Sequence, residues 1–382
     1  MRRILVVATT LQPPGGGSAV GAWILEALRD HYELTVLTWK PVDLGEVNRA
    51  FGTRLDAAAF HWATARPLIR GILDGIPLPL SLLTLNLLMR EARRLLKCTS
   101  FDGVIGTMNE LDVGVPAIQY VHYPWAFFPR PEADHRWYHG ALPLRLYRWC
   151  SARVSGYSRE RIRTNLTLVN SDWTGQRFEA WYRAPAKTVH PPVPGGFAEV
   201  PWEEREDAFV CMSRISPEKE LEKVIEILAA VRARGHDVRL TIVGHEDNRR
   251  YAERVRRVAA PHRGWISFRH GLSRSELVKL LPRHRYGIHG MVDEHFGIAP
   301  AELQRAGCIV FVPDRGGCAE IVAHDPRLVY GDIGQAVERI DRVLRDRQLR
   351  AALRTDLEAR RGEFSESRFM EQIRDEVAAF VA

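Results

Sequence analysis

The sequence is poor in cysteine and has no long hydrophobic run. Five cysteines are spread over 382 residues without any C-x-x-C pair, at Cys98, Cys150, Cys211, Cys308 and Cys318. This spacing argues against a disulfide framework or a zinc site and favours a reducing, cytoplasmic compartment. No uninterrupted run of about 18 apolar residues occurs either, so the sequence predicts no membrane-spanning helix.

The composition is that of a soluble globular protein with a basic surplus. Hydrophobic residues make up 46% and charged residues 26% of a chain long enough for two domains of about 150 to 200 residues each. The net charge is +7, and residues 1–200 hold 23 Lys and Arg against 17 Asp and Glu. Such a surface can meet an anionic lipid or a phosphorylated substrate. No basic stripe is interleaved with aromatic residues, so nucleic acid is not a predicted partner.

Short runs of Val, Ile and Leu alternate with segments of helical period, which predicts an α/β fold with parallel sheets. We expect strands in the first half at Arg3–Ala8, Glu33–Thr38, Gly103–Gly106, Ala117–His122, Leu166–Asn170 and Thr188–His190. In the second half we expect them at Phe209–Met212, Arg239–Val243, Trp265–Phe268, Tyr286–His289 and Cys308–Val312.

The stretch 193–207 is rich in proline, glycine and acidic residues and marks a domain boundary. We expect two Rossmann-like domains, residues 1–195 and 196–382, facing each other across a cleft. The last segment, 364–382, is helical in period and is a candidate to cross back to the first domain. In such folds ligands bind at the carboxyl ends of the strands, so the loops that follow strands are the places to search.

The stretch 76–97 is rich in leucine and has a basic end, with Arg90, Arg93, Arg94 and Lys97. Either it lies on a membrane surface or it covers a domain core as an amphipathic helix. The second use is commoner and is favoured here. Peripheral contact of the basic first domain with the inner face of the membrane stays open as an alternative to a fully cytoplasmic location.

Three glycines in a row follow the first predicted strand. Gly15, Gly16 and Gly17 precede a helix, where bare backbone lets amide groups approach a ligand and the helix N-terminus favours an anion. A tight turn would explain one glycine but not three. The G-x-G-x-x-G fingerprint is absent because Val20 stands at its last position, so a dinucleotide-dependent dehydrogenase is a weak fit.

The strongest candidate site follows a predicted strand of the second half. Glu294 and Glu302 are separated by seven residues that include Gly297. The amides around Gly297 would face an anion, while the two carboxylates would accept hydrogen bonds from hydroxyl groups on either side of it. This arrangement suits a nucleotide sugar. Ordinary acids at a helix start would explain Glu302 but leave Glu294 unexplained.

Two cations and a histidine complete the candidate set. Arg214 and Lys219 follow the first strand of the second half, where a guanidinium and an ammonium group could hold a diphosphate. Surface cations are usually solvated, so this pair alone is weak evidence. His122 ends a predicted strand of the first half and would point into the cleft, although a lone histidine in such a place is more often structural.

In this order the motifs resemble those of the family 4 glycosyltransferases, which are retaining enzymes of the GT-B fold. The resemblance covers nearly the whole chain. Four stretches resemble, more narrowly, the alpha-1,2-mannosyltransferases of the dolichol pathway: YVHYP at 120–124, VNSDWT at 169–174, VHPP at 189–192 and EHFGI at 294–298. Glu220 stands where the family usually has a glycine after the lysine.

The resemblance implies transfer of a hexose, with mannose as one candidate, from a GDP- or UDP-linked sugar to a hydroxyl of a glycan, glycolipid or small-molecule glycoside. It implies that Glu294 binds donor hydroxyls, that Glu302 binds the ribose and that His122 contacts the sugar or the phosphate. The implied catalytic residues are His122, Arg214, Lys219 and Glu294. The implied donor-binding residues are Gly16, Gly17, Arg214, Lys219, Glu294, Phe296, Gly297, Ile298 and Glu302.

No D-x-D sequence occurs in the chain, so a divalent metal lacks its usual carboxylate clamp. We therefore expect no cofactor beyond the nucleotide sugar, with Arg214 and Lys219 replacing the metal. A sugar-nucleotide epimerase or phosphorylase of the same fold is the main rival. A nucleotide-sugar-binding scaffold without activity is a second one. Glycosyl transfer is favoured because four recognisable loops would meet in one cleft.

Overall fold

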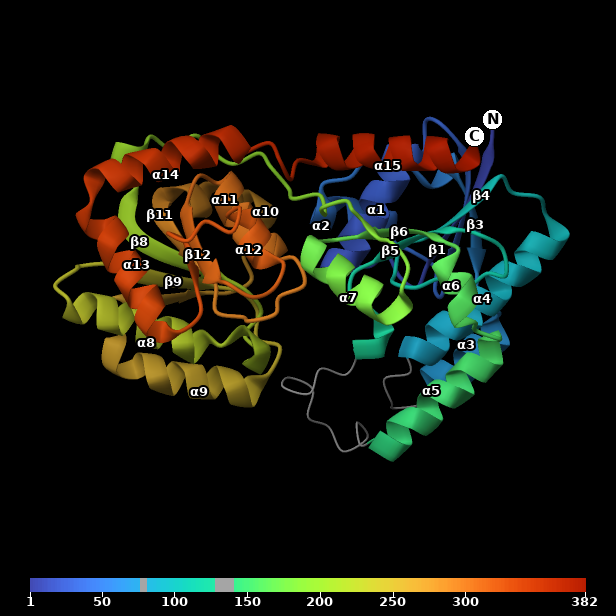
Figure 1. The fold of residues 1–382 in the computed structure, drawn as a ribbon, viewed down its shortest axis with the longest axis horizontal. Helices are drawn as coiled ribbons and strands as arrows, with labels where there is room; N and C mark the ends of the chain where they lie inside the picture. The colour runs from blue at the N-terminus through green and yellow to red at the C-terminus, as the bar shows by residue number, and fades with distance from the viewer. Residues whose placement is uncertain (76–80, 128–140) are drawn as a thin grey trace. The chain divides into compact units, whose positions relative to one another are not determined.

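The computed structural model describes residues 1–75, 81–127 and 141–382 (Figure 1). The chain forms two compact units, of which unit 1 comprises Met1–Pro192 with Glu366–Ala382 and unit 2 comprises Val193–Ser365. The boundary thus falls three residues before the predicted one. The C-terminal helix belongs to unit 1. The last segment of the chain therefore returns to the first domain, a possibility that the sequence left open.

Unit 1 is built on a seven-stranded sheet of order β3-β2-β1-β4-β5-β6-β7, in which every pairing is parallel. Its strands are β1 (Arg3–Ala8), β2 (Glu33–Thr38), β3 (Phe60–Thr64), β4 (Gly103–Gly106), β5 (Ile118–Val121), β6 (Leu166–Val169) and β7 (Lys187–Thr188). Along β1, Ile4 and Val6 join one hydrophobic cluster and Leu5 and Val7 another. Both faces of the sheet are therefore covered, as parallel sheets require.

The described helices of unit 1 cover that sheet. They are α1 (Gly16–Leu28), α2 (Leu44–Phe51), α3 (Pro67–Asp74), α4 (Ser81–Cys98), α5 (Ala141–Ser155), α6 (Arg159–Arg163), α7 (Asp172–Tyr182) and α15 (Glu366–Val381). Phe369, Ile373 and Val377 recur along one face of α15 and are buried in the cluster that also holds the apolar face of α1. Figure 1 shows α15 lying along α1, with both chain ends at the same side.

The leucine-rich stretch 76–97 is a core-covering helix in its described part. Leu85, Leu88 and Met89 of α4 are buried in the second cluster of unit 1, so the favoured interpretation is confirmed for residues 81–97. Residues 76–80 lie outside the described residues. No helix in the described ranges combines the length and the apolar character of a membrane-spanning segment.

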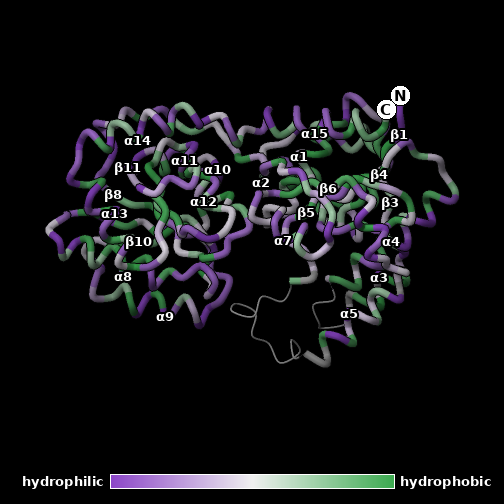
Figure 2. The backbone as a smooth tube through the Cα atoms, viewed as in Figure 1, coloured by the Kyte–Doolittle hydropathy of each residue, from purple (hydrophilic) through white to green (hydrophobic). Residues whose placement is uncertain are grey.

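Unit 2 repeats the architecture with a six-stranded parallel sheet of order β10-β9-β8-β11-β12-β13. Its strands are β8 (Glu206–Met212), β9 (Arg239–Val243), β10 (Ile266–Arg269), β11 (His284–Ile288), β12 (Ile309–Pro313) and β13 (Val329–Tyr330). Its α-helices are α8 (Leu221–Ala233), α9 (Arg249–Ala259), α10 (Arg274–Leu280), α11 (Ile298–Arg305), α12 (Cys318–Ile321), α13 (Ile333–Arg345) and α14 (Arg347–Arg360). Figure 2 shows hydrophobic residues gathered along the strands of both units.

Two strands were not predicted from the sequence. Strand β3 lies at the edge of the sheet, and only part of it is covered. Its polar residues His61 and Thr64 are exposed, so the strand does not appear as an apolar run. Strand β13 has only two residues, Val329 and Tyr330. A capping box starts α10, since Ser273 and Glu276 each bond the other's backbone.

Candidate functional site

Three loops of unit 2 leave the sheet at the same edge. Strands β8, β11 and β12 are neighbours and run parallel, so the segments after Met212, Ile288 and Pro313 all start at the carboxyl edge. Backbone bonds tie two of these loops together. Glu294 and Gly316 form an isolated bridge, and the amide of Gly317 donates to the Glu294 carbonyl at 2.7 Å. The position of Glu294 is therefore fixed by main-chain contacts.

A buried ion pair joins the first loop to the second. Lys219 Nζ lies 2.5 Å from Glu294 Oε2, and their side chains are 13% and 15% exposed. His289 Nε2 lies 3.2 Å from the same oxygen. Burial by itself would raise the pKa of Glu294, but the charge of Lys219 and the contact with His289 hold that pKa well below its usual value. Glu294 is therefore a carboxylate at neutral pH.

The pair keeps hydrogen-bonding capacity for a ligand. An ammonium group has three N–H donors, and Lys219 directs one to Glu294 and one to Met291 Sδ at 3.1 Å. Among the described residues, the third donor and Glu294 Oε1 have no partner. A cationic donor and an anionic acceptor side by side can bind a phosphate oxygen and a hydroxyl group of one molecule.

Close backbone approach explains the glycines around the pair. Gly316 has φ +101°, and a Cβ there would lie 2.7 Å from Glu294 N and 2.8 Å from Glu294 O. Gly290 is equally tight, because a Cβ would lie 2.8 Å from the carbonyl oxygen of Lys219. Any side chain at these positions would push the loops apart and separate Lys219 from Glu294.

We expect Gly316→Ala to lower the free energy of unfolding by about 2 kcal/mol or more, because a left-handed φ and a backbone clash are combined. Urea denaturation measures the change. Gly235→Ala is the matched control, since Gly235 has φ +96° and nothing within 4 Å of a Cβ. Gly235→Ala should lower the free energy of unfolding only by the cost of a left-handed backbone at a residue with a side chain, about 1 kcal/mol. Equal losses in the two variants would show that the clash is relieved at no cost.

The start of α11 presents free amides next to Glu294. Gly297 precedes the helix with φ +101°, and Pro300 has no N–H, so Ile298 and Ala299 supply the first-turn donors that have no partner among the described residues. The predicted contribution of Phe296 changes, because its side chain is only 2% exposed and packs against Phe364 in the core. Any contact of Phe296 with a donor would therefore come from its backbone, and that contact stays a prediction. Ile298 is partly buried against the same core.

The structure does not bring Arg214 and Glu302 into contact with this pair. Arg214 is half-exposed and forms ion pairs with Asp247 at 2.8 Å and Glu218 at 3.1 Å. Glu302 is buried and paired with Arg274 at 2.5 Å. Neither arrangement was predicted, and their assignment to the donor stays a prediction.

Glu220 has a backbone that explains why a glycine is usual there. It follows Lys219 with φ 48° and ψ 44°, in the left-handed region, and it also starts α8. His289 was missed by the sequence analysis, although it ends a predicted strand at the same edge. The signal available in the sequence was a polar residue at the end of a predicted strand.

Unit 1 gathers its own candidates at the carboxyl edge of its sheet. Strands β1, β4 and β5 are neighbours, and they are followed by the glycine loop, by Thr107 and by His122. Gly16 and Gly17 open α1. A Cβ on Gly17 would lie 3.2 Å from Met108 Sδ and 3.3 Å from His122 Nε2. The structure therefore places Gly17 and His122 together, and their part in a ligand site stays a prediction.

His122 is a neutral ring with a defined tautomer. Its Nε2 lies 2.9 Å from the Thr107 carbonyl oxygen, which can only accept, so Nε2 carries the proton. Burial lowers the pKa of His122 to about 4, against the opposing effect of this hydrogen bond. Nδ1 is then an acceptor at neutral pH. A neutral acceptor suits a sugar hydroxyl better than a phosphate.

The pKa of His122 makes stability depend on pH. The unfolded ring binds a proton near pH 6.5, whereas the folded ring does so only near pH 4. The free energy of unfolding is therefore highest above pH 6.5 and falls as the pH is lowered towards 4. His122→Gln removes this contribution. We expect the loss of unfolding free energy between pH 7 and pH 5 to shrink by about 1 kcal/mol, since the ring is only partly buried. Urea denaturation at the two pH values tests this, and an unchanged pH dependence would contradict it.

Helices α4, α5 and α7 of unit 1 line a cavity of about 200 Å³. Glu110 lines it together with Met89, Trp125 and Trp181. Burial raises the pKa of Glu110 to about 7, although hydrogen bonds from Tyr182 and from the Trp125 amide oppose the shift. Asn86, Arg148, Tyr157 and Tyr182 also line it, and a cavity of such mixed polarity could hold part of an acceptor. Glu110 was not predicted, because a single acid carries no distinguishing spacing.

Comparison with known proteins finds one family model that matches most of unit 2. Residues 197–359 match the family model for glycosyl transferases group 1. This range includes Lys219, Glu294 and all of α11. The loops that form the ion pair therefore lie within the stretch that matches the glycosyl transferases group 1 model.

Two curated relatives share one name, GDP-Man:Man(3)GlcNAc(2)-PP-Dol alpha-1,2-mannosyltransferase. The protein of Candida glabrata is 25% identical over 226 residues, which is 53% of this chain and 44% of the relative. That of Dictyostelium discoideum is 27% identical over 232 residues, which is 55% of this chain and 46% of the relative. The match spans less than half the length of these relatives.

Similar solved structures extend over nearly the whole chain. Anabaena HepE, crystallised with UDP and glucose, has a TM-score of 0.67 at 15% identity, with 99% of this chain and 100% of that one covered. WaaG, a glycosyltransferase involved in lipopolysaccharide biosynthesis, has a TM-score of 0.65 at 14% identity, with 97% and 98% covered. The predicted GT-B fold of two Rossmann-like domains is confirmed. Membership of family 4 stays a prediction.

Proposed function

We propose that the chain is a retaining glycosyltransferase that moves a hexose from a nucleotide-diphosphate sugar to an acceptor hydroxyl. The observation that carries the proposal is the buried Lys219–Glu294 pair at the carboxyl edge of a glycosyltransferase group 1 domain. GDP-mannose is the first donor to test, because the curated relatives are named for it. UDP-glucose is the second, because HepE was crystallised with it.

The proposed chemistry needs little beyond placed charges. The bond from the anomeric carbon to the diphosphate oxygen breaks, the acceptor oxygen bonds to the same face of that carbon, and the departing phosphate takes the acceptor proton. Negative charge grows on the phosphate, where the free N–H of Lys219 and the amides of Ile298 and Ala299 can stabilise it. Glu294 Oε1 accepts from a donor hydroxyl. In unit 1, His122 Nδ1 accepts from a sugar hydroxyl, and Gly17 allows the His122 ring to lie close to the start of α1.

Transfer is tested with each donor, with and without a glycolipid or simple glycoside acceptor. We expect a product only when acceptor is present, and NMR of its anomeric proton should show the configuration of the donor. Conversion of the donor alone would support the epimerase instead. Thermal shift separates the nucleotides, because only the bound one raises the melting temperature by mass action.

We expect transfer to persist in excess EDTA. Lys219 and the amides of Ile298 and Ala299 would stabilise the departing diphosphate without a divalent ion, and no D-x-D sequence is present to hold one. The rate measured with EDTA should stay within about twofold of the rate with added Mg²⁺ or Mn²⁺. A loss that added metal restores would overturn the metal-independent mechanism.

Contact with the cytoplasmic face of a membrane is also proposed, through α5. Leu146 and Trp149 are 62% and 56% exposed on this helix, and the exposed Arg153 lies over the Trp149 ring at 4.8 Å. Exposed apolar groups flanked by arginine suit an anionic lipid surface. The full chain should co-sediment with vesicles that contain anionic lipid, and Trp149→Ser should weaken this. Equal co-sedimentation with neutral vesicles would contradict a contribution of charge to this contact.

A further inference from the structure

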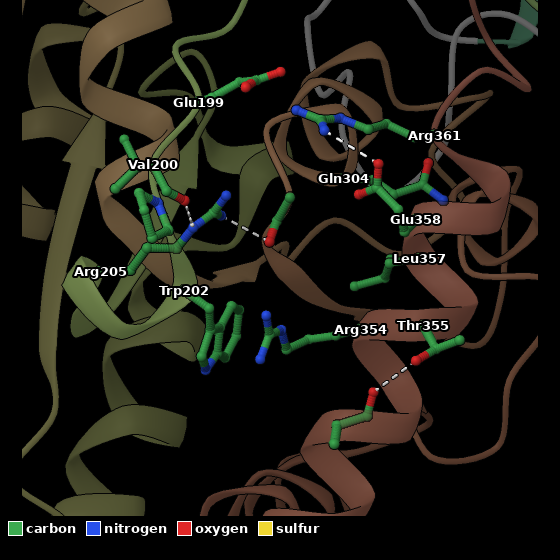
Figure 3. Close-up of a pocket in the computed structure, with 13 residues that line it drawn as sticks. Glu199, Val200, Trp202, Arg205, Gln304, Arg354, Thr355, Leu357, Glu358 and Arg361 are labelled. Atoms are coloured by element: carbon green, nitrogen blue, oxygen red, sulfur yellow. Dashed lines mark hydrogen bonds and ion pairs between the residues drawn. The ribbon is translucent and has the colours of Figure 1, made fainter.

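A cavity of about 830 Å³ lies within unit 2 at the other edge of the sheet (Figure 3). Residues 199–205 form one wall and lead into the start of β8, and Gly307 lies just before β12. The cavity is therefore at the amino ends of the strands, whereas Lys219 and Glu294 lie at their carboxyl ends. Helix α14 forms the opposite wall. This cavity plays no part in the proposed transfer.

An unpaired buried amide lines this cavity. Gln304, near the end of α11, is 1% exposed, and neither its side-chain oxygen nor its nitrogen has a hydrogen-bond partner among the described residues. Leaving such a group unpaired in the interior is costly, so natural proteins rarely do so without a ligand or solvent partner. Figure 3 shows Gln304 among the lining side chains, near Glu358 and Arg361. An amide can both donate and accept, as a hydroxyl group does.

Two arginines that line the cavity supply positive charge, and each has N–H groups that a ligand can use. Arg354 lies over the Trp202 ring at 4.7 Å, is 42% exposed, and has its nearest carboxylate, Glu203, at 3.8 Å. Arg361 donates from Nε to the Arg305 carbonyl and from Nη1 to Glu358, which leaves Nη2. A guanidinium held flat on an aromatic ring presents its N–H edge to an anion.

The third arginine is structural. Arg205 donates to the carbonyl oxygens of Val200, Ala306 and Gly307 at 2.8 to 3.1 Å. These bonds hold the two strand-entry segments together and shape the cavity wall. Its charge adds to the positive potential, while Glu199 and Glu358 can accept from hydroxyl groups.

We propose that this cavity binds a small hydroxylated anion of the sugar-phosphate class. Arg354 and Arg361 contact the phosphate, and Gln304 exchanges hydrogen bonds with the sugar hydroxyls. This site is independent of the proposed transfer, since it uses none of its residues and lies at the opposite edge of the sheet.

Calorimetric titration of the full chain with glucose 6-phosphate tests the proposal, with glucose and inorganic phosphate as separate arms. We expect saturable binding, with at least tenfold weaker binding of glucose and of inorganic phosphate. Arg354→Ala should weaken the binding of glucose 6-phosphate at least tenfold. Arg347→Ala is the matched control, because Arg347 is exposed on the same helix but does not line the cavity, and it should leave binding unchanged.

Two further variants keep the outcome interpretable. Gln304→Leu should weaken binding about tenfold while leaving the melting temperature equal or higher, because it removes an unpaired buried amide. Glu294→Gln should bind glucose 6-phosphate as the unaltered chain does. The proposal is overturned by absence of saturable binding, by full binding in Arg354→Ala and Gln304→Leu, or by loss in Glu294→Gln. Equal affinity for inorganic phosphate would overturn the role given to Gln304.

Discussion

Replacing Lys219 by alanine should lower transfer by a factor of about 100 or more. Lys219 lies at the carboxyl edge of the unit 2 sheet with its side chain 13% exposed, and it has one N–H donor left for a departing phosphate. Removing it also leaves the buried carboxylate of Glu294 without its main partner, so the pKa of Glu294 should rise. The rate of sugar transfer under saturating donor measures the loss.

Lys223→Ala is the matched control for this variant. Lys223 lies four residues after Lys219, in α8, and among the described residues its one ion pair is with Glu220, at 3.3 Å. Its loss should change transfer less than about threefold, in line with the small worth of surface ion pairs. Near-normal transfer by a folded Lys219→Ala variant would remove Lys219 from the mechanism.

Replacing Glu294 by glutamine should lower transfer by a similar factor, about 100 or more, for a different reason. The amide keeps the shape of the side chain but loses the negative charge that pairs with Lys219 and accepts from the donor sugar. We expect nucleoside diphosphate to bind nearly as before, because that contact belongs to Lys219 and the α11 amides. The loss should therefore lie in turnover rather than in nucleotide affinity.

A double variant separates stability from catalysis. Each single change leaves one buried charge unpaired, whereas Lys219→Met combined with Glu294→Gln removes both. The double variant should be more stable than either Lys219→Met or Glu294→Gln alone, yet just as inactive. Recovery of transfer in the double variant would mean that the pair serves only folding.

Much of the fold follows from local sequence. Strands such as β1 and β12 are buried on both faces, so each appears as an unbroken apolar run. The edge strand β3 has exposed polar positions and gives no such run. The two-residue strand β13 is too short to carry a periodicity. Helix α15 was recognisable as a helix, but its docking on α1 depends on contacts across the whole chain.

The candidate site was predictable in its residues but not in its pairings. Lys219 and Glu294 were both singled out as ligands, yet their contact joins positions 75 residues apart. The same applies to Arg214 with Asp247 and to Glu302 with Arg274, whose partners carry no motif of their own. Loop spacing reports which residues reach one sheet edge. It does not report which charges then neutralise each other.

A crystal structure of the chain with GDP bound tests the central claim most directly. The account predicts that diphosphate oxygens lie about 3 Å from Lys219 Nζ and from the amides of Ile298 and Ala299, at the carboxyl edge of β8 and β11. A diphosphate bound elsewhere, with Lys219 and Glu294 contacting only each other, would contradict it.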